Sequence, residues 1–295
     1  MMSTQKKILF LVNPISGVGK KNIIPKCIEE NLNLTQFEYQ IINTEYRKHG
    51  FEIAQQNKDK FDIIVAIGGD GTVNEIGTAL LHSSAALGII PTGSGNGLAR
   101  HLDIPLKIKD AILRINSGKE ITIDTATVND IPFIGTCGFG FDAHIAQKFD
   151  EYHKRGFISY AKLINKEFKT YKPLTFKIDN GKEIITKEVL MYCVANSSQF
   201  GNGFTISPKS DLQDGVFEHI FLDHFKIKNI FLLGRQFFNR QIDQSKFFSS
   251  FEAKQDVKVE ILNQSHSIFH IDGEPMKGSN QFVIKVVPQS LRIIC

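Results

Sequence analysis

The segment with the clearest chemical potential is the run Gly68-Gly69-Asp70-Gly71-Thr72, which follows an apolar stretch and precedes a helical pattern. Its glycines let the backbone turn sharply and approach a ligand without Cβ clashes. The helix that we expect from Thr72 or Val73 would direct unpaired N–H groups and its positive end into the same crevice. An aspartate among those amides makes chemical sense if a divalent cation bridges it to a phosphate. The run therefore predicts a nucleotide-phosphate site, and a plain turn with Asp70 as helix N-cap is the alternative.

Two further loops occur in the same strand-to-helix context. One spans Pro91 to Gly97, and the other spans Asn13 to Lys20. The second is not a Walker A loop, because Pro14 stands where that motif needs glycine and Lys21 stands where it needs Ser or Thr. No Gly-x-Gly-x-x-Gly fingerprint with a suitably placed acid is found either. The chain therefore lacks the commonest nucleotide-binding motifs but has loops suited to enclosing a nucleotide.

Two acidic turns stand in the second half of the chain. Asp211-Leu-Gln-Asp214-Gly215 offers two hard oxygen ligands for Mg²⁺ or Ca²⁺, although Asp-Gly turns are common. Asp272-Gly273-Glu274 follows an apolar run, and phosphoryl transfer requires a carboxylate that orients a hydroxyl and accepts its proton. If Asp272 and Glu274 belong to one extended segment, their side chains share a face. A simple β-turn is the alternative that the residues alone favour.

The first third of the chain alternates between apolar strands and short helical patterns, which predicts a doubly wound parallel sheet. The expected strands are Ile8–Val12, Glu38–Asn43, Phe61–Ile67 and Ala86–Ile90, and the expected helices are Ile23–Leu32, Tyr46–Asn57, Thr72–Leu81 and Leu98–Leu102. After about Ile121, short alternating runs between turn residues predict an antiparallel β-rich domain. These runs are Leu174–Asp179, Glu188–Ala195, Val216–Phe221, Val257–Leu262, Ser267–Ile271 and Phe282–Val287, with helical stretches at Tyr152–Thr170 and Lys228–Asn239. We expect an α/β nucleotide-binding domain over residues 1–122 and a β-sandwich over 123–295, whose final strand returns to either domain.

The composition limits the class of partner and the compartment. The 295 residues carry 35 Lys and Arg against 31 Asp and Glu, an excess too small to indicate nucleic-acid binding but compatible with anionic phosphates or lipids. The four cysteines are scattered without a C-x-x-C spacing, which favours a reduced protein. The N-terminal apolar run is too short for a signal peptide or a membrane span. We therefore expect a cytoplasmic protein that visits the inner face of the membrane transiently.

The order and spacing of these blocks resemble those of the diacylglycerol kinase catalytic family, which includes sphingosine kinases and soluble bacterial lipid kinases. The matching blocks are Asn13-Pro14-Ile15-Ser16-Gly17, Gly68 to Glu75, Pro91 to Ala99, Asp211 to Gly215 and Ile271 to Pro275. The resemblance covers nearly the whole chain. It implies a two-domain kinase that uses ATP and Mg²⁺, binds the nucleotide in a cleft between its domains and phosphorylates a lipid hydroxyl.

The same resemblance implies roles for individual residues. It assigns Asp272 and Glu274 as the general-base pair, coupled to Asp70. It assigns a structural magnesium to Asp211, Asp214 and the carbonyl of Val216. The nucleotide would be lined by Asn13, Pro14, Ser16, Gly17, Thr44, Gly68, Gly69, Asp70, Gly71, Thr72 and Asn74, with Gly93, Ser94 and Asn96 near the phosphates. The second loop, Gly93-Ser94-Gly95-Asn96-Gly97, is closer to sphingosine kinases than to bacterial diacylglycerol kinases, so both a sphingoid base and diacylglycerol stay candidates.

Two segments, Glu151–Lys172 and Phe225–Phe251, combine cations with aromatic residues at helical spacing. Interfacial helices have this composition. Helices packed on the sandwich with a solvated basic face are an equally good interpretation. We hypothesise that one of these faces rests on the bilayer that holds the lipid substrate, and we leave a homodimer open.

Two other functions are compatible with part of the sequence. A soluble-substrate kinase of the NAD kinase type shares Gly-Gly-Asp-Gly but does not predict Gly-Ser-Gly-Asn or Asp-Gly-Glu-Pro in this order. A nucleotide-sensing protein without activity could lose its base without cost, yet Asp70, Ser94, Asp272 and Glu274 are all present. The sequence therefore favours a lipid kinase.

Overall fold

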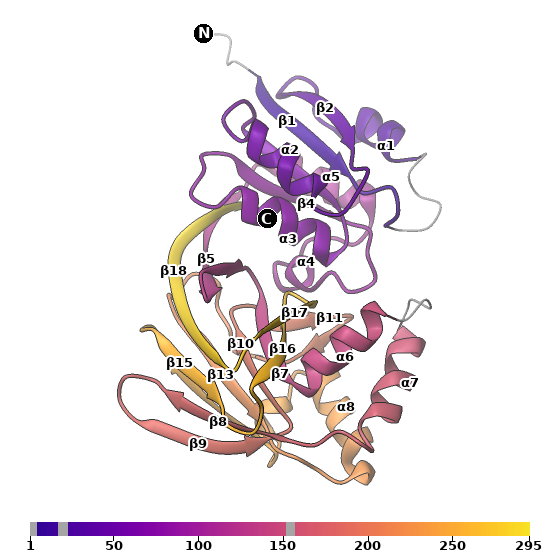
Figure 1. Cartoon of the computed structure of the whole chain (residues 1–295). Coiled ribbons are helices and arrows are strands. Elements are labelled where there is room, and N and C mark those ends of the chain that lie inside the picture. The colour runs from indigo at the N-terminus through magenta and orange to yellow at the C-terminus, as the bar shows by residue number, and fades with distance from the viewer. Residues whose placement is uncertain (1–4, 17–22, 152–156) are drawn as a thin grey trace. The chain divides into compact units, whose positions relative to one another are not determined.

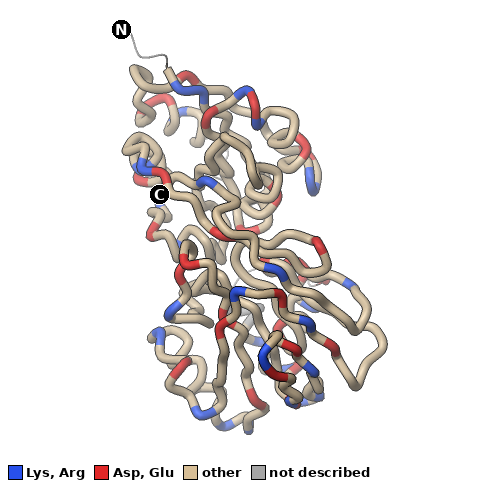
Figure 2. Tube along the Cα trace, turned by 90° about the vertical axis from the view of Figure 1, so that its left-hand side faces the viewer, with Lys and Arg blue, Asp and Glu red and all other residues tan. Residues whose placement is uncertain are grey.

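The computed structural model of the chain describes residues 5–16, 23–151 and 157–295, which form two compact units (Figure 1). Unit 1 comprises Met1–Ile123 and Gln289–Cys295, and unit 2 comprises Asp124–Pro288. The chain passes between the units twice, within strand β5 (Glu120–Val128) and within strand β18 (Gln281–Ile294). Basic and acidic residues are interspersed along the trace (Figure 2), in keeping with the small net charge.

Unit 1 is built on a parallel sheet. Its strands β2 (Phe37–Asn43), β1 (Lys6–Val12), β3 (Ile63–Gly68) and β4 (Ala86–Pro91) pair in that order, all in parallel. The last residues of β18 add a further parallel strand beside β4. Every residue of β3 and β4 is buried, as expected for strands that are covered on both faces. The doubly wound parallel sheet predicted from the sequence is confirmed.

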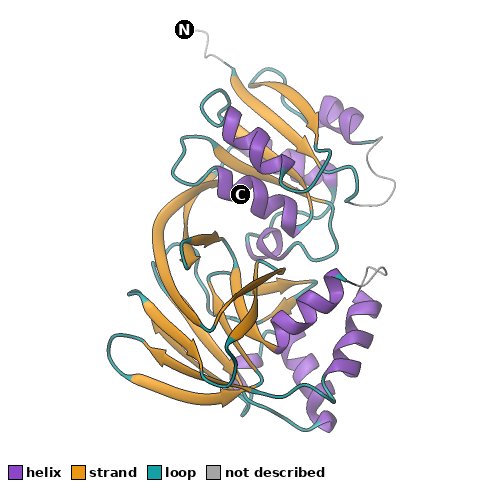
Figure 3. Ribbon diagram, in the orientation of Figure 1, coloured by secondary structure: helices purple, strands orange, loops and turns teal. Residues whose placement is uncertain are grey.

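The helices of unit 1 form two packed pairs. Helix α2 (His49–Asn57) packs on α3 (Asp70–Ala79), and α1 (Ile24–Asn31) packs on α5 (Ile108–Ser117). Right-handed crossovers place the pairs on opposite faces of the sheet (Figure 3). A short helix, α4 (Gly97–His101), follows β4 directly. The sequence analysis did not predict α5, although its buried residues recur at helical spacing: Ile108, Ala111, Ile112 and Ile115.

Unit 2 contains the predicted antiparallel sandwich. One sheet has the order β14 (Phe248–Ala253), β13 (Phe217–Leu222), β10 (Met191–Ala195), β7 (Thr136–Gly140), β16 (His266–Ile271) and β17 (Glu274–Ser279). The other contains β18, β15 (Val257–Ile261), β8 (Leu174–Asp179) and β9 (Ile184–Val189), with β5 and β6 (Ile131–Phe133) attached, and a small sheet joins β11 (Gln199–Gly201) to β12 (Phe204–Thr205). The aromatic core includes Phe139, which stacks on Tyr192 and Phe269.

A second apolar core covers the other face of the six-stranded sheet. Alternate residues of β10 divide between the two cores, since Tyr192 faces the first and Cys193 faces the second. The second core is completed by helices α6 (Phe141–Asp150), α7 (Phe157–Glu167) and α8 (Ile230–Phe238), with short 3₁₀ turns η1 (Ile227–Asn229) and η2 (Ile242–Gln244) flanking α8. Helix α6 was not predicted, and the single strand expected over Glu188–Ala195 is two strands that break at Leu190. Of the helix expected over Tyr152–Thr170, residues 152–156 lie outside the described part of the chain.

In the described part of the chain, no helix is both long and apolar enough to cross a membrane.

Candidate active site

The topology of unit 1 creates a crevice at the carboxyl end of its sheet. The chain leaves β1 toward β2 on one side and returns to β3 on the other, so the strand order reverses between β1 and β3. Ligands of open α/β sheets bind at such a reversal. Asn13 directly follows β1, Gly69 follows β3, and Thr92 follows β4. The three loops that the sequence singled out therefore share one edge of the sheet.

Hydrogen bonds join the three loops to one another. The side-chain amide of Asn13 donates to Thr72 Oγ1 at 3.0 Å, and Thr92 Oγ1 donates to Ser16 Oγ at 3.2 Å. The amide of Thr92 donates to the carbonyl of Gly68 at 2.8 Å. Thr44, at the end of β2, is buried and donates its amide to Val12. Thr92 was not among the predicted site residues, although its position directly after a strand matches that of Asn13.

The Asp70 carboxylate ties the first glycine loop to the second. Its two oxygens accept hydrogen bonds from the backbone amides of Asn96 at 2.8 Å and Gly97 at 2.6 Å. The N-cap of α3 is Gly69, so Asp70 is not the N-cap that the alternative interpretation required. Asp70 instead anchors the start of α4, where Asn96 has a φ of +54°. These contacts give Asp70 a positioning role, and its proposed link to a cation stays a prediction.

The backbones of the two glycine loops pass in direct contact. A Cβ placed on Gly93 would lie 2.5 Å from the Cα of Gly69, a backbone atom that cannot swing aside. The carbonyl of Gly93 also accepts a hydrogen bond from the Asn96 side chain at 2.8 Å. Only glycine at position 93 permits this approach.

We expect Gly93→Ala to weaken ATP binding about tenfold or more, because the inserted methyl group forces the loops apart at a cost of about 1–3 kcal/mol. Gly234→Ala is the matched control, since a Cβ at this α8 position meets nothing within 4 Å. Isothermal titration with ATP measures both affinities. An unchanged ATP affinity of the Gly93→Ala protein would show that the close contact between Gly93 and Gly69 is not needed for nucleotide binding.

The first turn of α3 presents backbone donors at the same edge. In any α-helix the first N–H groups have no intrahelical acceptor, and here the helical ladder starts with Val73 N, which donates to Gly69 O at 3.1 Å. Gly71 and Thr72 belong to this turn, and Asn74 lies just beyond it. Ser94 is exposed at the tip of the second loop, Pro14 stands in the turn after β1, and Gly17 lies outside the described residues. The arrangement suits an anionic phosphate.

In unit 2, Asp272 and Gly273 form the two-residue turn of the β16–β17 hairpin. Ile271 pairs with Glu274, and both turn residues have positive φ, +49° and +86°, as a type I′ turn requires. The extended segment that would have put Asp272 and Glu274 on one face is therefore not formed. Glu274 is the first residue of β17 and half-buried. The local conformation is therefore a β-turn, and the role of Asp272 and Glu274 as a general-base pair stays a prediction.

Three backbone amides hold the Asp272 carboxylate. Ile134 donates to one oxygen at 2.9 Å, and Gly135 and Thr136 donate to the other at 2.8 Å each. The amide of Asp272 donates in turn to the carbonyl of Thr136 at 2.8 Å. Charge-assisted bonds of this kind are stronger than neutral ones. They fix the orientation of the carboxylate against the β6–β7 connection.

A buried pair of side chains supports this turn. His270 Nδ1 accepts a hydrogen bond from the amide of Gly273 at 3.3 Å, and its Nε2 lies 3.1 Å from Asp142 Oδ2. Because Nδ1 accepts, Nε2 is the donor to Asp142. Gly138 makes room for the pair, since a Cβ there would lie 2.0 Å from Asp142 Oδ2. The sequence analysis missed Asp142. The sequence feature that could have identified it is the spacing Gly138-x-Gly140-x-Asp142 at the start of α6.

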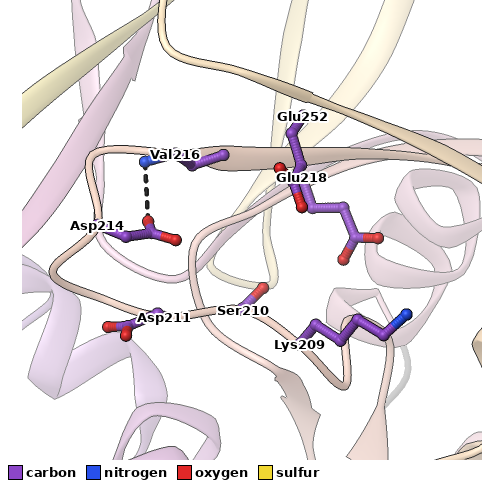
Figure 4. Close-up of a pocket in the computed structure, with 7 residues that line it drawn as sticks. All are labelled: Lys209, Ser210, Asp211, Asp214, Val216, Glu218 and Glu252. Carbon is purple, nitrogen blue, oxygen red and sulfur yellow. Dashed lines mark hydrogen bonds between the residues drawn. The ribbon is translucent and has the colours of Figure 1, made fainter.

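The predicted metal ligands lie together in a pocket of unit 2 (Figure 4). Asp211 and Asp214 line one side of it, and Glu218 and Glu252, which pair across β13 and β14, line the other. One oxygen of each aspartate accepts a local amide, Gln213 N for Asp211 and Val216 N for Asp214, both at 2.9 Å. Two carboxylates with the carbonyl of Val216 match the hard oxygen ligands that Mg²⁺ takes together with waters. The donor set therefore fits this cation.

The turn from Asp211 to Gly215 is held by a residue that sequence reasoning did not find. Asp124, which is almost fully buried, accepts a hydrogen bond from Gly215 N at 2.7 Å and donates its own amide to Leu212 O at 2.7 Å. Among the described residues no group of three or more His, Cys, Asp or Glu side chains is arranged to hold a metal ion.

Comparisons with known proteins agree with the motifs. Residues 7–128 match the family model of the diacylglycerol kinase catalytic domain. Residues 135–295 match that of the YegS C-terminal domain, which is described as NAD kinase β-sandwich-like.

Similar curated proteins include an uncharacterized protein of Synechocystis sp., 30% identical over 201 residues, which are 64% of this chain but 46% of that relative. The chain thus aligns with less than half the length of this relative. The "Probable lipid kinase YegS-like" of Klebsiella pneumoniae is 30% identical over 237 residues, 78% of this chain and 77% of that protein. A crystal structure described as that of a diacylglycerol kinase from Bacillus anthracis superposes with a TM-score of 0.75 at 20% identity, covering 98% of this chain and 96% of the other. At that identity the structural similarity supports the fold.

Proposed function

Because the chain belongs to the diacylglycerol kinase catalytic family with a YegS-type C-terminal domain, we propose that it transfers the γ-phosphoryl group of ATP to a hydroxyl of a lipid. The observation that carries the proposal is the Asp70 carboxylate, which clamps the second glycine loop to the first at the carboxyl edge of the unit 1 sheet. Phosphoryl transfer depends mainly on positioning and on charge stabilisation. A rigid edge of backbone amides supplies both for the phosphates of ATP.

The acceptor hydroxyl needs a base, and we assign that role to Asp272 with Glu274 beside it. Asp272 is held by three backbone amides, so its carboxylate has a fixed orientation from which it can receive a proton. The His270–Asp142 pair keeps the turn in place from the other side. Mg²⁺ bound with ATP would neutralise charge on the transferring group. Asp211, Asp214 and Val216 would hold a second, structural Mg²⁺.

Two features bear on which lipid is the acceptor, and they favour different lipids. The description of the catalytic family favours diacylglycerol, and the Klebsiella relative is named a probable lipid kinase without a stated lipid. The loop Gly93-Ser94-Gly95-Asn96 favours a sphingoid base. The description of the C-terminal family also keeps NAD as an alternative acceptor.

All four cysteines are free thiols, in keeping with a reducing compartment, and we place the enzyme in the cytoplasm, where it meets lipid at the inner face of the membrane.

The proposal is tested by incubating the protein with γ-labelled ATP, Mg²⁺ and separate mixed micelles of diacylglycerol, monoacylglycerol, ceramide and a sphingoid base, with NAD in a further sample. We expect label on one lipid class and none on NAD, with the transfer abolished by EDTA. Label on NAD alone would assign the protein to the soluble-substrate kinases. ATP binding without transfer to any acceptor would favour a nucleotide sensor.

A further inference from the structure

The segment from His224 to Ile242 carries four cations and no carboxylate. Its cations are Lys226, Lys228, Arg235 and Arg240, all of which are exposed. The acids that flank the segment are already engaged elsewhere: Asp223 pairs with Lys187 at 2.8 Å and Asp243 with Lys209 at 3.4 Å. Within the described part of the chain, none of the four cations has an ion-pair partner. The segment is therefore a local positive region in a protein of nearly balanced charge.

The same segment exposes large apolar side chains. Helix α8 packs inward through Leu233 and Phe237, which are buried in the second core of unit 2. The opposite side leaves Phe231 83% exposed and Leu232 52% exposed. Phe238 at the end of α8 and Ile227 in η1 are also exposed, 46% and 43% respectively. Helix α8 lies at the periphery of unit 2 (Figure 1), and no element among the described residues covers these side chains fully.

The exposed apolar residues and two of the cations share one face. At about 100° per residue, this face spans an arc of about 140°. It contains Ile227, Lys228, Phe231, Leu232, Arg235 and Phe238, and we call it the α8 face. The inward residues Ile230, Leu233 and Phe237 lie on the other side of the helix. Apolar side chains interleaved with cations on one exposed arc are the pattern of a helix that lies in a membrane interface.

The other basic segment lacks this combination where the structure describes its side chains. Over residues 161–172, Leu163 and Phe168 are buried in the second core, and Ile164 and Tyr171 pack against it. No large apolar side chain is exposed there. Its described cations therefore stand on a polar surface, whereas those of α8 surround an apolar one.

We propose that the α8 face docks the protein on the surface of an anionic lipid bilayer. This inference rests on the proposed lipid kinase activity, since the lipid acceptor would be embedded in that bilayer. Charge complementarity selects the occupant: phosphate headgroups neutralise the cations while Phe231 and its apolar neighbours enter the acyl boundary. A second copy of the chain is a poorer fit, because in a two-fold symmetric contact the cations of one face would oppose those of the other.

Sedimentation of the full chain with lipid vesicles, without ATP, tests the proposal. One set of vesicles contains equal parts of phosphatidylcholine and phosphatidylglycerol, and the other contains phosphatidylcholine alone. We expect binding to the first set only. Each cation at an anionic surface is worth about fivefold in partitioning, so Lys228→Gln with Arg235→Gln should lower binding about 25-fold. Phe231→Ala should lower it about tenfold.

The matched control is Lys182→Gln with Lys254→Gln, which removes the same charge from exposed positions elsewhere on unit 2 and should leave binding within about twofold of wild type. Equal losses in the control and in the α8-face variants would refute the site, as would undiminished binding of the α8-face variants. A dimer in solution that these variants convert to monomer would make the face a protein interface instead.

Turnover on a monomeric short-chain lipid should be unchanged in all variants. If wild type itself lacks that turnover, the kinase proposal fails while the vesicle result still stands.

Discussion

Replacing Asp272 with asparagine is expected to lower the turnover of lipid phosphorylation at least about 100-fold while ATP affinity stays unchanged. The amide keeps the size of the carboxylate and tolerates the positive φ of this turn position, but it cannot accept a proton from a hydroxyl. ATP binding depends on the loops of unit 1, and Asp272 belongs to unit 2. Steady-state kinetics and isothermal titration with ATP measure the two quantities separately.

A structural loss must be distinguished from a chemical one in this variant. The new NH₂ group would face one of the backbone amides that now donate to Asp272, which costs about 1–3 kcal/mol of unfolding free energy. Denaturant unfolding measures that cost, and assays run well below the midpoint exclude unfolding as the cause of lost turnover. Asp130→Asn is the control, since Asp130 stands in the two-residue β5–β6 turn with a φ of +62° and is exposed. Turnover within about tenfold of wild type in Asp272→Asn would contradict the assignment of the base.

Replacing Asp70 with asparagine is expected to weaken ATP binding about 10- to 100-fold. The carboxylate serves two amides of the second glycine loop, and charged hydrogen bonds are each worth about 1.5–3 kcal/mol. An asparagine side chain can accept from one amide only, and its NH₂ group would oppose the other. The second loop would then lose its fixed position beside the first turn of α3.

Isothermal titration with ATP checks this prediction, with Asp110→Asn as control. Asp110 also stands in the first turn of a unit 1 helix, α5, so its replacement removes a similar helix-dipole interaction without touching the loops. An ATP affinity of the Asp70→Asn protein equal to that of the control would show that the clamp is not needed for nucleotide binding.

The parts of the fold that the sequence predicted are those with strong local patterns. Strands β3 and β4 of unit 1 are nearly continuous apolar runs that end at turn residues, and such runs indicate buried parallel strands. Helix α5 was missed because its pattern follows a proline-containing stretch, and its C-terminal signal, Gly118 in the left-handed region, was not used. The break at Leu190 was missed because the apolar run continues across it, while the chain changes from one sheet to the other.

The candidate site was predictable where function depends on short motifs. The loops around Asp70 and Gly93 could be placed at one sheet edge from the alternation of elements alone. The supporting contacts could not, because they join distant parts of the chain: Asp142 meets His270, 128 residues away, and Asp124 meets Gly215, 91 residues away. The conformation of Asp272 also escaped sequence reasoning about a shared face, since the Asp-Gly pair makes a tight turn instead of an extended strand.

The fate of the γ-phosphoryl group under competition tests the central claim most directly. The wild-type chain is mixed with γ-labelled ATP, Mg²⁺ and equal concentrations of NAD and of diacylglycerol and sphingoid base in mixed micelles, and the products are separated by organic extraction. Label recovered in the organic phase as a phosphorylated lipid, and lost in Asp272→Asn, is the predicted result. Label that stays in the aqueous phase, on NAD or as inorganic phosphate, would contradict the account.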